Sequence, residues 1–294
     1  CCDKMRKDNR EAWHLHYTTL PKEYALLSLA VLSLVVLNNA VVLTTFFRIK
    51  PFKLSYYIII GLAIADVLTI IPLAQGLVTF MSSRIWLTDN LCDLLGVFYT
   101  GNIAATHWLH CLLCVERCIS VMNPFAHKSF SLRRMSAYTM GTIVIVHILL
   151  AYLVLMLCLL VGTVKFQFDP SLASCGLDSN PRARNILFLI FDTPKILVQL
   201  VCYTLMVNRL KNLQGADRKR IRRALKVVLL TLMLFYACFL PYYIELIIMH
   251  NRSLSPTSPA RLLCVEGIFL NSAMSGVIYY VSMPEFKKYI KDRF

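Results

Sequence analysis

The side chains best suited to chemistry in this sequence lie inside long apolar stretches. Asp66 stands in the run Leu-Ala-Ile-Ala-Asp, near the middle of one such stretch. An unpaired carboxylate is costly in these surroundings, so Asp66 must be protonated, paired or bound to a cation. Asp192 and Lys195 stand three residues apart in another stretch. Their charges would neutralise one another as a structural pair, which we favour over a contact with a ligand.

Histidine and cysteine residues in the same stretches offer further chemistry. His107 and His110 could titrate near neutral pH and sense protons, although a structural role is the commoner one. Cys111 and Cys114 have C-x-x-C spacing, but no second cluster of Cys or His accompanies them. Cysteines in such surroundings act as small apolar residues, so we expect neither a redox site nor a cofactor.

The composition indicates what kind of chain positions these residues. Of the 294 residues, 57% are hydrophobic and 16% are charged, and the mean hydropathy is +0.61. These values exclude a water-soluble globule and a disordered chain, so we expect an integral membrane protein. The 31 Lys and Arg exceed the 16 Asp and Glu. Because the basic residues lie between apolar segments, they are expected to set membrane orientation, and no nucleic-acid partner is expected.

Seven stretches are long enough to cross a bilayer as helices, which takes about 20 mostly apolar residues. They run approximately over residues 24–47, 56–80, 92–121, 136–161, 187–207, 224–249 and 260–283. Since the runs are continuously apolar rather than alternating, helices are favoured over a β-barrel. We predict an all-α membrane protein whose fold is a seven-transmembrane helix bundle.

The basic residues also predict how the chain is oriented. Most of them follow the first, third, fifth and seventh spans, which places those connections and the C-terminus in the cytoplasm. We therefore expect an extracellular N-terminal segment over residues 1–23, a transmembrane domain over 24–283 and a cytoplasmic amphipathic helix over 284–294. The first ten residues are charged and contain no apolar signal region, so the first span is expected to act as the insertion signal.

A series of residues, one or more in each of several spans, carries a resemblance to a known family. In chain order they are Asn39, Asp66, Cys92, Glu116-Arg117-Cys118, Pro194, Pro241, Asn271–Tyr279 and Phe286. On these residues, and on the interval between Cys92 and Arg117, the sequence resembles a rhodopsin-like (class A) G-protein-coupled receptor. It departs from the family's pattern at Cys118, where Tyr is usual, at Phe239, where Trp is usual, and at Ser275-Gly276, where Asn-Pro is usual.

The resemblance implies roles for three groups of residues. The switch that couples to the G protein would comprise Glu116, Arg117, Phe235, Phe239, Pro241 and Tyr279. The alternatives are that Arg117 only extends to the membrane interface and that the two phenylalanines only pack the core. A sodium ion would bind Asp66, Asn39, Thr106, Asn271, Ser272 and Ser275, whose oxygen atoms suit a hard cation; a protonated Asp66 in a structural network is the alternative. Cys92 and Cys175 would form a disulfide at the extracellular side.

The resemblance also implies that an acid near the inner end of the sixth span often restrains Arg117. Here that stretch is basic apart from Asp217. We therefore expect raised signalling in the absence of ligand.

The extracellular ligand is unknown, and the sequence only narrows its chemistry. No Lys occurs in the seventh span, which disfavours retinal, and Tyr99 stands where receptors for monoamines have Asp. The outer mouth would instead be lined by Tyr99, Tyr242, Tyr243, Glu245, Arg261 and Glu266. A peptide, a nucleotide or an acidic lipid would suit this mixture, and interfacial anchoring is the alternative role of such residues. Asn251 begins a glycosylation sequon, Asn-Arg-Ser.

We therefore expect a plasma-membrane receptor that is not an enzyme and whose partners are a heterotrimeric G protein, an extracellular ligand and membrane lipids. The rival class is a transporter or channel that uses Asp66 and Asp192 as pathway carboxylates. Such a protein often shows paired Gly/Pro-interrupted helices in two matching halves, and this sequence shows no such pairing.

Overall fold

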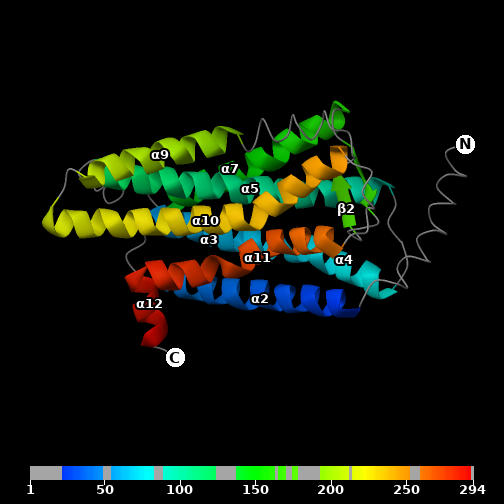
Figure 1. Ribbon diagram of the computed structural model, residues 1–294, viewed down its shortest axis with the longest axis horizontal. Coiled ribbons are helices and arrows are strands. Elements are labelled where there is room, and N and C mark those ends of the chain that lie inside the picture. The colour runs from blue at the N-terminus through cyan, green and yellow to red at the C-terminus, as the bar shows by residue number, and fades with distance from the viewer. Residues whose placement is uncertain are drawn as a thin grey trace, which may run out of the picture.

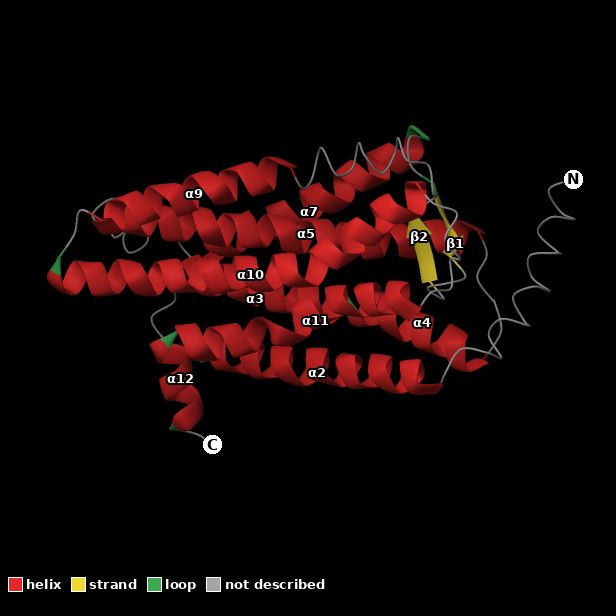
Figure 2. Cartoon of the chain, in the orientation of Figure 1, coloured by secondary structure: helices red, strands yellow, loops and turns green. Residues whose placement is uncertain are grey.

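The computed structural model describes residues 22–48, 54–82, 89–123, 137–162, 165–169, 174–177, 193–211, 214–251 and 259–292. Within these ranges the chain forms an elongated bundle of roughly aligned helices with one short β-hairpin at its end (Figure 1, Figure 2). The helices are α2 (Lys22–Phe46), α3 (Leu54–Leu68), α4 (Ile70–Ser82), α5 (Asp89–Met122), α7 (Ala137–Leu160), α9 (Thr193–Lys211), α10 (Gly215–Asn251), α11 (Pro259–Ser282) and α12 (Pro284–Lys291). The strands are β1 (Phe166–Asp169) and β2 (Ser174–Leu177).

The helices confirm the predicted bundle. Each predicted span corresponds to one helix, except that α3 and α4 together make the second span. Four described segments are long and apolar enough by themselves to cross a membrane: Ala25–Phe46, Leu54–Val78, Leu225–Tyr242 and Leu263–Ser282. The apolar part of α7, Val144–Leu160, is shorter. Helices α5 and α9 are less apolar because they carry buried polar side chains on their inward faces.

The outer surface of the bundle is apolar, as a lipid-facing surface should be. Exposed side chains include Leu29 on α2, Leu153 on α7, and Leu197 and Leu200 on α9. An apolar surface of this extent would be a liability in water but is the favourable one in a bilayer.

The second span is interrupted at a single turn. Thr69 separates α3 from α4, and its hydroxyl donates a hydrogen bond of 2.5 Å to the carbonyl oxygen of Asp66. Pro72 lies three residues later and has no N–H to donate to the carbonyl of Leu68. The missing backbone bond and the competing threonine hydroxyl explain why the helix breaks here.

Helix α10 is longer than predicted and bends. It begins at Gly215 rather than near residue 224, so most of the basic run between Arg209 and Lys226 is helical instead of a loop. Between Gly215 and Pro241 this segment contains no other glycine or proline and is rich in Ala, Leu, Lys and Arg, which favour helices. Figure 1 shows the change of direction towards the C-terminal end of α10, which contains Pro241.

A β-hairpin covers the N-terminal end of α5. We call the end of the bundle at the hairpin its outer end and the opposite end, at α12, its inner end. Strands β1 and β2 pair antiparallel with Phe168 opposite Cys175, and Cys175 forms the expected disulfide with Cys92 on α5. The backbone N–H of Phe166 donates to Asp93 Oδ1 at 3.1 Å. A Cβ atom at Gly96 would lie 2.3 Å from the ring of Phe166, so a residue without a side chain is required for this approach. The strands themselves were not predicted.

Helix α12 lies at the opposite end of the bundle from the hairpin and turns away from α11 (Figure 1). Its Phe286 is buried and stacks on Phe46 of α2 with 5.2 Å between ring centroids. Tyr56 of α3 donates a hydrogen bond to Glu285, while Lys287 and Lys288 are exposed. This helix is therefore amphipathic within the predicted range 284–294, with its apolar side against α2.

Candidate functional site

Asp66 is the centre of a polar network between α3 and α11. Its side chain is 1% exposed, and Ser275 Oγ donates to its Oδ2 at 3.1 Å. The hydroxyl of Ser272 also hydrogen-bonds this carboxylate. Ser272 and Ser275 fall on one face of α11 because they are three residues apart, and both are buried. The structure thus brings the predicted acid together with two of its predicted partners.

Two consecutive asparagines on α2 bind the backbone of α11 beside this network. Asn39 Nδ2 donates to the carbonyl oxygen of Ser272 at 3.0 Å and to that of Val35 at 3.0 Å. Asn38 donates to the carbonyl oxygen of the next residue, Ala273. The stretch of α11 that carries the serines is therefore fixed to α2.

Several buried oxygens of the predicted sodium-binding residues have no hydrogen-bond partner among the described residues. They are Asp66 Oδ1, Asn39 Oδ1 and Thr106 Oγ1. Asn271, also predicted here, is 2% exposed, and its carbonyl oxygen accepts from Ser275 Oγ at 3.2 Å. Unpartnered buried oxygens are costly, and a carboxylate with neutral oxygen donors is the set that a hard cation prefers. The residues present therefore fit a sodium ion.

A stack of aromatic rings joins α5 to α10. His107 lies edge-on to Phe235 and Phe239, with centroid distances of 4.6 and 4.8 Å. The two phenylalanine rings stack on each other at 4.5 Å. From α9, Lys195 Nζ lies 4.2 Å from the centroid of the Phe235 ring. Phe235 thus contacts side chains from two neighbouring helices just inside the proline of α10.

The inner end of α5 carries the predicted Glu116 and Arg117. Arg117 Nε lies 3.4 Å from Glu116 Oε2, and the two side chains are 20% and 3% exposed. Tyr279 on α11 is 1% exposed, and its hydroxyl has no partner among the described side chains. Cys118 packs in an apolar cluster with Cys202 and Met206 of α9. The side chain of Asp217 lies outside the described ones.

The outer half of the bundle contains part of the predicted ligand-binding set. The Tyr99 ring lies 6.0 Å from that of Phe269, and Tyr99 interacts electrostatically with Tyr242 and Glu266. Glu266 accepts a hydrogen bond from Ser28 of α2, while its Oε2 is buried without a partner among the described residues. These residues bring α2, α5, α10 and α11 together.

The other predicted outer residues are only partly described. Tyr243, Glu245 and Asn251 belong to α10 and Arg261 to α11, but their side chains lie outside the described ones. Asp192 lies outside the described residues altogether.

Sequence reasoning missed two buried polar residues that join helices. Asn102 of α5 is 1% exposed, and its Nδ2 donates to the carbonyl oxygen of Ala65 at 2.7 Å. Gln199 of α9 is 4% exposed. Each is a polar residue in an apolar helix, which is the signal that could have identified them.

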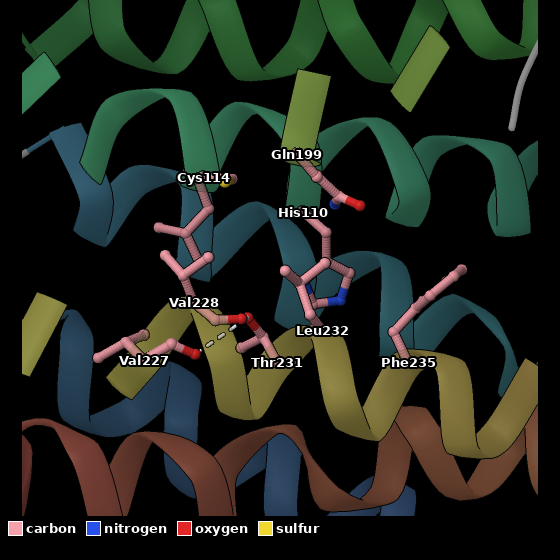
Figure 3. Close-up of a pocket in the computed structure, with 9 residues that line it drawn as sticks. His110, Cys114, Gln199, Val227, Val228, Thr231, Leu232 and Phe235 are labelled. Atoms are coloured by element: carbon pink, nitrogen blue, oxygen red, sulfur yellow. Dashed lines mark hydrogen bonds between the residues drawn. The ribbon is translucent and has the colours of Figure 1, made fainter. Parts of the chain in front are cut away.

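Gln199 borders a small cavity between α5, α9 and α10 (Figure 3). The other lining residues are His110, Leu113 and Cys114 of α5 and Val227, Val228, Thr231, Leu232 and Phe235 of α10. The centre of a water molecule could occupy about 10 Å³ of this cavity, which is roughly the room that one bound water needs. His110 and Gln199 both point towards it.

The sequence matches one protein family over most of its length. The family model described as 7 transmembrane receptor (rhodopsin family) matches residues 38–279. The chain belongs to this family. The match extends from the asparagines of α2 to Tyr279, so it includes the polar network, the aromatic stack and the inner end of α5.

Individual relatives share about a quarter of their aligned residues with this chain. Free fatty acid receptor 3 of Rattus norvegicus is 24% identical over 89% of this chain and 80% of its own length. The uracil nucleotide/cysteinyl leukotriene receptor of Rattus norvegicus is 25% identical over 77% of this chain and 69% of its own length. C-C chemokine receptor type 6 of Mus musculus is 24% identical over 72% of this chain and 58% of its own length.

The chain is therefore a rhodopsin-like G-protein-coupled receptor. Because its relatives are named for different ligands, its own ligand must be argued from its own residues. The family assignment favours this class over the transporter or channel considered from Asp66 and Asp192.

Proposed function

We propose that this receptor converts the binding of an extracellular ligand into an outward movement of α10 and nucleotide exchange on a heterotrimeric G protein. It would act in the plasma membrane with its N-terminus outside and its C-terminus in the cytoplasm. Two features at opposite ends of the bundle support this orientation. The Cys92–Cys175 disulfide suits an oxidising exterior, whereas the basic ends of α9 and α12 suit the cytoplasmic side.

The observation that carries the proposal is the packing of Phe235 and Phe239 against His107, within two turns of Pro241 on its N-terminal side. A proline weakens its helix locally, because it removes one backbone hydrogen bond. Rings that bridge two helices at that level can repack between two discrete arrangements. A ligand that favours one arrangement would therefore change the direction of the inner half of α10.

At the inner end, we assign Arg117 to contact with the G protein and Glu116 to its restraint. Their short separation supports a closed arrangement in which Glu116 holds the guanidinium. Tyr279, buried at the same end of α11 with an unpartnered hydroxyl among the described residues, is available for a new hydrogen bond when α10 moves.

The Asp66 network would set the balance between the two arrangements. Asp66, Asn39, Thr106, Ser272 and Ser275 would hold a sodium ion, and Asn271 would position Ser275 through its backbone carbonyl. When bound, the cation neutralises the carboxylate. The chain's own part is to hold α2, α3 and α11 together through the hydrogen bonds of Asn39 and Ser275.

Of the three ligand classes considered, the described outer residues favour a peptide. Glu266 offers a buried carboxylate oxygen, and Tyr99, which also neighbours Tyr242, lies close to Glu266. A carboxylate beside aromatic rings suits a cationic group such as a peptide amine or guanidinium, and it repels a phosphate or a fatty-acid carboxylate. Tyr243, Glu245 and Arg261 would complete the site from the outer ends of α10 and α11.

The test is ligand-free dissociation of a panel of G-protein subtypes in cells, compared with mock-transfected cells at matched surface expression. The variants are Arg117→Ala and Pro241→Ala, and the control is Leu240→Ala, because Leu240 is exposed on α10. We expect a signal above mock that both variants lower and the control leaves unchanged. Equal signals in wild type and Arg117→Ala would contradict coupling through Arg117. Silence across the panel would contradict raised signalling without ligand.

A further inference from the structure

The cavity between α5, α9 and α10 contains two polar atoms that the described protein leaves without hydrogen bonds. They are Nε2 of His110 and Oε1 of Gln199. Gln199 is 4% exposed, and both side chains line the cavity (Figure 3). A buried polar group without a partner is unfavourable, so this pair indicates that something polar binds between them.

The two atoms restrict the chemistry of the occupant. Oε1 of Gln199 accepts hydrogen bonds and therefore requires a donor. Nε2 of His110 donates when it carries the proton of the neutral ring, so it requires an acceptor. An oxygen that bears a hydrogen satisfies both atoms at once, whereas an anion cannot donate to Gln199.

The charge of Lys195 and the size of the cavity further restrict what the occupant can be. Lys195 lies one turn from Gln199 on α9 and interacts electrostatically with His110, which disfavours a cation in the cavity. The room available is roughly that of a single water molecule. The remaining walls are mainly apolar, with Leu113, Val228 and Leu232 among them.

Thr231, the third polar residue of the cavity, does not donate a hydrogen bond to the occupant. The hydroxyl of Thr231 donates back to its own helix, with Val227 O at 3.1 Å and Val228 O at 2.9 Å. Its oxygen lone pairs remain able to accept a hydrogen bond from the occupant.

We propose that the cavity bounded by His110, Gln199 and Thr231 is a binding site for one hydroxyl group, supplied by water or by the head of an alcohol in the membrane. The hydroxyl accepts from His110 and donates to Gln199, so it links α5 to α9. It lies next to α10 at Phe235, and outward movement of α10 would widen the site. The site is separate from the Asp66 network and does not depend on G-protein coupling.

Radiolytic hydroxyl-radical footprinting with mass spectrometry tests the site, because radicals formed from a bound water oxidise the side chains beside it. The protein is the full chain in phosphatidylcholine nanodiscs that contain no alcohol. Cys114 lines the cavity and is the reporter, while Cys238 is a buried thiol outside the lining set. We expect Cys114 to be oxidised several-fold faster than Cys238 in the wild-type protein.

The variant that removes both partners is His110→Leu with Gln199→Met, which replaces polar atoms by apolar groups of similar size. The control is Leu200→Met, because Leu200 is next to Gln199 and exposed on the outer face of α9. The double variant should lower the oxidation of Cys114 to the rate of Cys238, and the control should not. Unchanged oxidation of Cys238 in the double variant shows that its bundle is intact.

Adding 1-octanol identifies the source of the hydroxyl. Protection of Cys114 in the wild-type protein, but not in the double variant, shows that an alcohol head occupies the site. Absence of protection assigns it to water. Equal oxidation of Cys114 in wild type and double variant, or oxidation no faster than that of Cys238, would overturn the proposal.

Discussion

Asn38 on α2 lies directly over Gly276 on α11, so closely that a Cβ atom at Gly276 would be 2.5 Å from Asn38 Oδ1. The same asparagine donates to the carbonyl oxygen of Ala273, one turn earlier in α11. Gly276 is the residue at which the chain departs from the family's proline. The departure has a structural reason, since α2 approaches the space that a proline ring would occupy.

We therefore predict that restoring the family residue destabilises this receptor. Gly276→Ala should lower the free energy of unfolding by about 1–3 kcal/mol, the usual cost of overpacking. Gly276→Pro should lower it by about 3 kcal/mol or more, because a proline inside a helix adds its own cost. Both added Cβ atoms would also lie 2.8 Å from Val42, and Pro should be the worse of the two because it further removes a backbone hydrogen bond inside α11. Thermal unfolding of the purified receptor measures the effect.

A matched control and a rescue variant sharpen this test. Val277→Ala changes the neighbouring residue, which is exposed on α11, and should have little effect. Asn38→Ala should partly rescue Gly276→Ala, because it removes one of the two close neighbours. If Gly276→Ala were as stable as the wild-type protein, the close approach of α2 would not limit this position.

The contrast between Gly276 and the spans shows what the sequence can predict. A transmembrane helix is a local property of about 20 apolar residues, so all seven spans were predicted. The close approach of Asn38 joins residues more than two hundred positions apart, and the break at Thr69 depends on a side-chain hydrogen bond in addition to Pro72. The short strands β1 and β2 depend on pairing with each other and on Phe166 reaching Gly96.

The candidate site shows the same limit. Asp66 stands out because a carboxylate in an apolar helix needs an explanation, and Ser275 was found only through the resemblance. Gln199 and Lys195 face the interior from α9. The sequence marks His110 and Phe235 as notable residues, but nothing local shows that His110 lies across a cavity from Gln199 or that Phe235 lies against Lys195. Contacts between three helices are set by the packing of the whole bundle.

A second prediction concerns the hydrogen bond between Ser275 and Asp66. Ser275→Ala removes a donor to a buried carboxylate and should cost about 1–3 kcal/mol of stability. Asp66→Asn should abolish any difference in melting temperature between sodium chloride and choline chloride, because it removes the charge that a cation would neutralise. Thermal unfolding of the purified receptor in the two salts measures both effects.

Ser33→Ala is the control for the serine substitution. Ser33 is exposed on α2, and its hydroxyl donates to Leu29 of its own helix at 2.8 Å. A loss of stability no larger in Ser275→Ala than in Ser33→Ala would show that the bond to Asp66 contributes nothing. Sodium stabilisation that persists in Asp66→Asn would place the cation elsewhere.

A third prediction concerns the disulfide between α5 and β2. Cys92→Ser, Cys175→Ser and the double variant should each lose about 2–4 kcal/mol of stability, because each removes the same cross-link. Leu94→Ala, at an exposed residue of α5 close to Cys92, is the control. Melting temperatures with and without reducing agent measure the loss, and reduction should affect only proteins that retain the bridge. Clearly additive losses in the double variant would contradict a shared bond.

The last prediction concerns Glu116, whose carboxylate lies 3.4 Å from Arg117 Nε. Because the Glu116 side chain is only 3% exposed, water screens this ion pair weakly. Glu116→Gln keeps the shape but removes the charge, so Arg117 should leave the closed arrangement more easily. We expect ligand-free G-protein dissociation to rise on the order of fivefold, which corresponds to losing about 1 kcal/mol of closed-state stability.

Ile119→Val is the control for this change, because Ile119 is exposed on the lipid side of the same helix. Adding Arg117→Ala to Glu116→Gln should abolish the increase, since the freed guanidinium is the group proposed to contact the G protein. An increase that survives in the double variant would mean that Glu116 restrains α5 through other contacts. A decrease in Glu116→Gln alone would mean that its carboxylate supports the active arrangement rather than the closed one.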